Sequence, residues 1–162
     1  MSSWSIIKGL KFRQVAVLTG LFFRHPLFMF STTRATFLAM KIAQKEYPGI
    51  HGRHNKANAF RHALWNILIA VKCHNFSNDL DLILSWTKRI TDWHEEFSPN
   101  EELAKEMDLH NNRIGREMYT EVFQKDMNKI VKLMKEKLLE AIQVGAFQDF
   151  EKHQNQLVYL ED

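Results

Sequence analysis

The sequence contains little cysteine, proline or glycine, and each shortage narrows the range of folds. Its single cysteine, Cys73, excludes an internal disulfide and any cysteine-rich zinc site. Six glycines and three prolines in 162 residues are too few for a turn-rich β-sandwich. Hydrophobic residues at 45% and charged residues at 25% are ordinary for a globular protein. A chain of this length can form one domain with its own hydrophobic core.

Acidic residues are almost absent from the first third of the chain. Residues 1–61 hold ten lysines and arginines but one acid, Glu46, whereas residues 62–162 hold twelve basic and eighteen acidic residues. A basic segment can face anionic lipid, nucleic acid or the acidic remainder of its own chain. Because phenylalanine and leucine are mixed here with lysine and arginine, we expect peripheral membrane contact as one role of this segment, beside charge balance within the chain.

Long hydrophobic runs are also missing. The longest uncharged run, Gln14 to Phe23, is too short to span a bilayer. The stretch that follows it offers no small-residue cleavage site of the kind that ends a signal peptide. We therefore expect a cytoplasmic protein without a signal peptide or transmembrane helix.

Helical periodicity dominates what is present. It predicts helices over residues 6–23, 31–47, 55–73 and 80–97, a fifth from about 101, and an amphipathic segment continuing to about 142. Ser31 or Thr32 is the expected N-cap of the second helix, and Ser98 with Glu101 resembles a capping box for the fifth.

The chain is therefore expected to be a single all-α domain, a bundle of about five to seven helices. Residues 1–50 form its basic, phenylalanine-rich N-terminal helices, residues 51–118 a core that carries the polar motifs, and residues 119–162 an amphipathic C-terminal helix and tail. A stripe of large apolar residues in this last segment predicts core packing or an oligomer contact (Phe123, Met127, Ile130, Met134 and Leu138).

Two of the predicted core helices carry unexpected polar residues. In "NKANAFRHALWNILIA", Asn58, His62 and Asn66 follow one another at four-residue steps, so they share one helix face. The stretch "MDLHNNRIGRE" repeats this spacing (Asp108, Asn112 and Arg116), with Gly115 beside it to permit a close approach. Between them, "DWHEEF" adds His94 and Glu95. We expect these groups to converge in one polar pocket.

Two chemistries suit such a pocket. In the first, a divalent metal ion (zinc, manganese or iron) is held by histidine and aspartate, and Glu95 moves a proton; the candidate ligands are His62, His94, Asp108 and His110. In the second, His62 or His94 is a general base that Glu95 or Asp108 orients. Arg116 then stabilises an anion, and the other anion-binding candidates are Arg61, Asn58, Asn66, Asn111 and Asn112.

These residues favour a hydrolase that acts on a phosphoester or a phospholipid, with an anionic small molecule or lipid as its ligand. The alternative is a non-enzymatic interaction module that binds an anionic membrane or a protein partner, in which the polar cluster is a satisfied network that holds the helices together. Nothing in the sequence matches a nucleic-acid recognition motif, so specific nucleic-acid binding is not expected.

The motif set "NAFRHALWN", "HE" and "MDLHNNRIGRE" resembles an uncharacterised bacterial domain family, often found at the ends of secreted or toxin-like proteins. The resemblance covers about residues 55–118 and implies that the functional residues are the motif positions Asn58, Arg61, His62, Trp65, Asn66, His94, Glu95, Asp108, His110, Asn111, Asn112, Gly115 and Arg116. A weaker likeness is to the HD-type metal phosphohydrolases, whose ligand order His62, His94-Glu95 and Asp108 follow, with glutamate where that family has aspartate.

Overall fold

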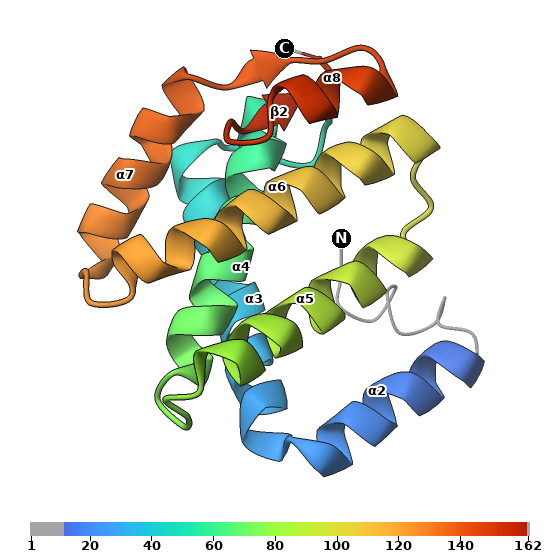
Figure 1. Ribbon diagram of the computed structural model, residues 1–162, viewed down its shortest axis with the longest axis vertical. Coiled ribbons are helices and arrows are strands. Elements are labelled where there is room, and N and C mark those ends of the chain that lie inside the picture. The colour runs from blue at the N-terminus through green and yellow to red at the C-terminus, as the bar shows by residue number, and fades with distance from the viewer. Residues whose placement is uncertain (1–11, 162) are drawn as a thin grey trace.

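A computed structural model describes residues 12–161 as an all-α domain (Figure 1). Its helices and two short strands are α2 (Phe12–Arg24), α3 (Pro26–Glu46), α4 (Lys56–Cys73), α5 (Leu80–Phe97), α6 (Glu102–Val122), α7 (Met127–Leu139), β1 (Ile142–Gln143), α8 (Phe147–Lys152) and β2 (Val158–Tyr159). The all-α prediction is confirmed. Part of the first predicted helix, residues 6–11, lies outside the described residues.

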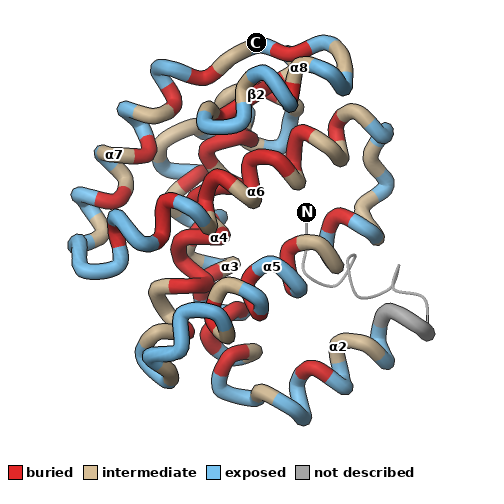
Figure 2. Tube along the Cα trace, in the orientation of Figure 1, coloured by how far each residue is buried: buried red, intermediate tan, exposed pale blue. Residues whose placement is uncertain are grey.

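Helix α4 is the centre of the bundle. It packs against α3, α5, α6 and α7, and Figure 2 shows buried residues concentrated along α4 and the facing side of α6. A helix surrounded by others is expected to be apolar on most of its faces, and α4 meets that expectation with a run from Ala57 to Cys73 that is largely buried. Asn55 caps it, because its side chain accepts a hydrogen bond from the Asn58 amide at 3.2 Å.

The second predicted helix begins earlier than expected. Helix α3 begins at Pro26, whose fixed φ and missing N–H suit the first helical position. Ser31 and Thr32 are therefore buried inside the helix rather than at its N-cap, and the Thr32 hydroxyl donates to the Phe28 carbonyl at 2.9 Å. The N-cap prediction was wrong because it weighed a polar capping residue above the proline at which the helix begins.

The boundary before α6 also differs from the prediction. Glu101 is the N-cap and makes no side-chain capping bond, while the Ser98 hydroxyl donates back to the His94 carbonyl at the end of α5. The expected capping box is therefore absent. Helix α6 then ends at Val122, and Asp126 caps a separate α7, so the amphipathic segment is two helices rather than one.

The C-terminal segment folds back onto the middle of the chain. β1 and β2 pair in parallel through two residues each, Ile142 with Val158 and Gln143 with Tyr159. The apolar stripe of the segment divides: Ile130, Met134 and Leu138 are buried, whereas Phe123 is exposed. Core packing therefore accounts for most of that stripe.

Within residues 12–161, no single helix has both the length and the hydrophobicity needed to cross a membrane. Residues Val15–Arg24 and Pro26–Glu46 together satisfy those requirements, but the two helices meet at a bend of 119°.

Candidate metal and active site

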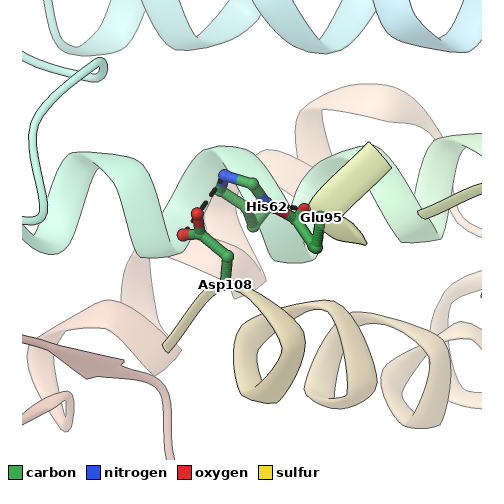
Figure 3. Close-up of side chains that lie close together, drawn as sticks. All are labelled: His62, Glu95 and Asp108. Carbon is green, nitrogen blue, oxygen red and sulfur yellow. Dashed lines mark ion pairs between the residues drawn. The ribbon is translucent and has the colours of Figure 1, made fainter. Parts of the chain in front are cut away.

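Three side chains from three different helices meet in the interior (Figure 3). His62 comes from α4, Glu95 from α5 and Asp108 from α6, and each is at most 2% exposed. The imidazole lies between the carboxylates: Nδ1 is 3.3 Å from Glu95 Oε1, and Nε2 is 3.4 Å from Asp108 Oδ1. One ligand atom from each residue lies within 4.8 Å of the other two, so this group could hold a metal ion.

A close crossing of α4 and α6 makes this meeting possible. A Cβ added at Gly115 would lie 2.3 Å from the carbonyl oxygen of Ala63, the residue after His62. Only glycine therefore fits the crossing point, as the sequence suggested. Because the backbones touch there, the polar residues one and two turns earlier on α6, Asn112 and Asp108, reach the polar face of α4.

A hydrogen-bonded row of amides extends from the Glu95 side of the imidazole. The Asn112 side chain donates to Glu95 Oε1 at 2.9 Å and accepts from Asn66 Nδ2 at 2.7 Å. The Asn66 oxygen in turn accepts from the Thr91 hydroxyl at 3.2 Å and from Arg116 Nη1 at 3.1 Å. Arg116 thus lies at the far end of the row, and the side chains of Asn112 and Asn66 separate it from the imidazole.

On the other side of the imidazole, two asparagines hold the Asp108 carboxylate, and Arg61 contacts the ring. Asp108 Oδ1 accepts from Asn58 at 3.4 Å and Oδ2 from Asn100 at 3.0 Å. One nitrogen of Arg61, Nη2, lies 2.7 Å from His62 Nε2 and 2.6 Å from Asn58 Oδ1. A positively charged group therefore already lies beside the imidazole and the Asn58 amide oxygen, at the ring nitrogen that also faces Asp108.

The Arg61 contact defines which nitrogen of His62 carries the proton. A guanidinium only donates hydrogen bonds, so Nε2 must accept and the proton is on Nδ1. Nδ1 faces Glu95 Oε1 and Asn112 Oδ1, each at 3.3 Å. This arrangement, with Nδ1–H directed at a carboxylate and the Nε2 lone pair directed at a cationic group, is the usual one for histidines that ligate metals.

Burial and neighbouring charges shift the two carboxylates in opposite directions. Burial raises the pKa of Asp108, and the negative charge of Glu95 adds to that rise. Burial also acts to raise the pKa of Glu95, but the hydrogen bonds that its carboxylate accepts from His62 and the Asn112 amide act against burial, and the pKa of Glu95 is lowered. Burial lowers the pKa of Arg61. One buried oxygen, Glu95 Oε2, has no hydrogen-bond partner.

Three of the predicted site residues lie elsewhere. His94 is exposed and contacts the Trp65 ring edge-on at 5.2 Å between centroids. His110 is buried on another side of α6, where Nε2 lies 2.9 Å from the Gln156 carbonyl and the ring packs on Phe150. Asn111 holds β2, because its side chain donates to and accepts from the Val158 backbone. The structure brings the other candidates together: Asn58, Arg61, His62, Asn66, Glu95, Asp108, Asn112 and Arg116.

Sequence reasoning missed two members of the cluster. Thr91 lies four residues before Glu95 on α5, so the shared helix face was a signal that could have identified it. Asn100 lies in the loop between α5 and α6, where no periodicity applies. Two loop histidines outside the cluster, His51 and His54, are half-buried, and each has a buried Nδ1 without a hydrogen-bond partner.

Two hollows of about 430 and 700 Å³ open on the surface, between α2 and α5 and beside α7. Neither is lined by His62, Glu95 or Asp108. Among the residues of the cluster that contact the imidazole or Asp108, Arg61 and Asn100 are half-buried rather than fully buried. The cluster therefore approaches solvent on the side of Arg61 and Asn100.

The fold and the cluster define an all-helical domain with a buried histidine between two carboxylates. Residues 19–142 match the model of a family described as a domain of unknown function (DUF6973), and the chain belongs to that family. The expected resemblance to an uncharacterised domain family is confirmed. No curated protein and no solved structure matches the chain.

Proposed function

We propose that this protein is a metal-dependent hydrolase of phosphoester bonds whose centre is the buried cluster of His62, Glu95 and Asp108. The observation that carries the proposal is the convergence of these three groups, from three helices, within 4.8 Å of one another: Asp108 lies beside Nε2 of His62 as a second candidate ligand, and Glu95 supports the imidazole from the Nδ1 side. Imidazole and carboxylate ligands suit zinc, manganese and iron.

The position of Arg61 supports a cation site on the Nε2 side of His62. Its Nη2 atom is within 2.7 Å of both His62 Nε2 and Asn58 Oδ1, and Asp108 Oδ1 is 3.4 Å from the same imidazole nitrogen. One nitrogen ligand (from His62) and two oxygen ligands (from Asp108 and Asn58) therefore surround a position that already attracts positive charge. These residues would hold a metal ion in the place that the Arg61 guanidinium now takes, and the ion would balance the charge of the buried carboxylates.

The remaining residues have distinct roles in this proposal. Glu95 accepts a hydrogen bond from Nδ1–H of His62 and keeps the imidazole oriented, and Asn112 holds Glu95 in place by donating to it. Once displaced, Arg61 lies on the solvent side of the cluster, where its planar guanidinium can bind two phosphate oxygens. A bound divalent metal ion supplies a hydroxide nucleophile near neutral pH. Arg61 and the basic first third of the chain both favour an anionic substrate.

A purely structural network explains the cluster less well. Such a network is stable when every buried polar atom has a partner, because an unpaired one costs roughly 1–3 kcal/mol. Glu95 Oε2 has none, and the pKa of Asp108 is raised, so its negative charge is only partly compensated. The unpaired oxygen shows that the network is incomplete, and the raised pKa of Asp108 is expected of a site that takes up a further cation beside that carboxylate.

Metal binding is the direct test. The protein is stripped with chelator, and zinc and manganese are titrated separately by calorimetry, with elemental analysis of the untreated protein. We expect about one equivalent in the wild type and none in His62→Ala or Asp108→Asn. Glu95→Gln should weaken binding by roughly 10- to 100-fold, as loss of a supporting carboxylate does. Arg61→Gln should strengthen it, because the competing guanidinium is gone.

His110→Ala is the matched control, since it removes an equally buried histidine of α6 that lies outside the cluster. It should bind metal as the wild type does. Hydrolysis of bis(p-nitrophenyl) phosphate and p-nitrophenyl phosphate is then followed with and without metal. A wild type that binds no metal, or a His62→Ala variant that retains both metal and activity, refutes the proposal. Hydrolysis that needs His62 but no metal would refute the metal-dependent mechanism. It would support instead a mechanism in which His62 acts as a general base.

A further inference from the structure

Helix α3 has two opposite faces, and one of them has no partner within the described residues. Its small residues Ala35, Ala39 and Ala43 are buried on the side that packs against α4. The other side carries an outward stripe at three- and four-residue steps (Leu27, Phe30, Arg34, Phe37 and Lys41). Phe37 is 64% exposed, and Leu27 and Phe30 are 54% and 53% exposed.

Exposed large apolar side chains are concentrated in this part of the molecule. Seven of the thirteen in the described residues lie between Val15 and Met40, and Phe23 at the end of α2 is the most exposed of the seven, at 77%. Single exposed apolar residues are normal, but a group of them marks an interaction surface. In Figure 1, α2 projects from the bundle at the bottom of the view and joins α3 at a sharp turn.

The charge of this surface is of one sign. No acidic residue precedes Glu46, and Glu46 pairs with Lys135 of α7 at 2.8 Å. Arg24, Arg34 and Lys41 are exposed among the apolar residues, and the Arg34 guanidinium lies 4.8 Å from the centre of the Phe30 ring. Aromatic and aliphatic side chains flanked by basic groups are complementary to the surface of an anionic bilayer.

We propose that the exposed face of α2 and α3, residues 15–45, docks on anionic phospholipid membranes without crossing them. The combined hydrophobicity of the two helices reaches that of a membrane span, which a nucleic-acid-binding surface does not need. Crossing would require α3 to leave α4, against which its alanine face is buried. This inference does not depend on the proposed hydrolase activity.

Co-sedimentation with vesicles tests it, using the full chain in chelator so that no turnover interferes. Vesicles of phosphatidylcholine alone are compared with vesicles that contain about one-third phosphatidylglycerol. We expect the wild type to bind the anionic vesicles and to be released by salt. Arg34→Gln with Lys41→Gln should weaken binding about 30-fold, since each basic residue near the surface contributes about 1 kcal/mol. Phe30→Ser with Phe37→Ser should weaken it at least tenfold.

Phe76→Ser with Phe147→Ser is the matched control, because these side chains are 49% and 54% exposed outside α2 and α3. This pair should leave vesicle binding unchanged, and circular dichroism should show all variants folded. The proposal is overturned if the wild type binds neither vesicle at low salt, if it binds both equally, or if the control pair weakens binding as much. Single-stranded RNA that displaces the protein from vesicles through the same residues would also overturn it, in favour of a nucleic-acid surface.

Discussion

Replacing Gly115 with alanine tests whether the crossing of α4 and α6 positions the cluster. The new Cβ would lie 2.3 Å from the Ala63 carbonyl oxygen and 2.7 Å from its Cα, whereas ordinary contacts begin at 3.4 Å. Because both obstructing atoms belong to the backbone, no side chain can turn aside. The two helices must separate by about 1 Å, which is overpacking of the kind that costs roughly 1–3 kcal/mol.

Helix propensity acts in the opposite direction. Alanine stabilises a helix by up to about 1 kcal/mol relative to glycine, so the expected net loss is about 1–2 kcal/mol. For a domain of this size that corresponds to a fall in Tm of roughly 2–8 °C. The same separation lengthens the 2.7 Å bond between Asn66 and Asn112 beyond hydrogen-bond range, so metal affinity should also fall.

Urea unfolding followed by circular dichroism measures the change, with Gly20→Ala as the control. Gly20 lies in α2, and a Cβ there meets nothing within 4 Å, so alanine should stabilise the protein. The two substitutions are chemically identical and are expected to have opposite signs. If Gly115→Ala is as stable as the wild type, the close approach does not constrain the fold and our account of the site is wrong.

Three further outcomes follow from the cluster and the core. Asn112→Ala removes the partner of both Glu95 and Asn66, and should lower the free energy of unfolding by roughly 1–3 kcal/mol in thermal melts; an unchanged Tm would contradict the row of hydrogen bonds. The pKa of Glu95 is lowered from 4.5, so in metal-free protein its ionised carboxylate adds to the free energy of unfolding. This stabilisation is fully present above pH 4.5 and is lost as the pH falls through the lowered pKa. The stability difference between wild type and Glu95→Gln should therefore shrink below pH 4.5, and a difference that grows on acidification would show the opposite sign. Burial raises the pKa of Cys73 to about 12, so a thiol reagent should label it in urea but not in the native protein, and fast native labelling would refute its burial.

The sequence alone determined the helical architecture and the residues of interest, because both depend on local spacing. The 3.6-residue period gave α4 and α5 almost to the residue, and it placed Asn58, His62 and Asn66 on one face before any contact was known. Helix starts were less predictable. The starts of α3 and α6, at Pro26 and after Glu101, depend on competition between proline, capping residues and tertiary contacts. The spacing of apolar residues carries no information on that competition.

Only the tertiary structure decided which of the polar residues meet. His94 and Glu95 are adjacent in the chain, yet one side chain is exposed and the other is buried against His62, because neighbouring helical residues point about 100° apart. His110 and Asn111 likewise turn away from Asp108 and Asn112, towards the C-terminal segment. A sequence lists candidate ligands by type, whereas their distances depend on how α4, α5 and α6 cross, and that crossing depends on long-range packing such as the contact of Gly115 with Ala63.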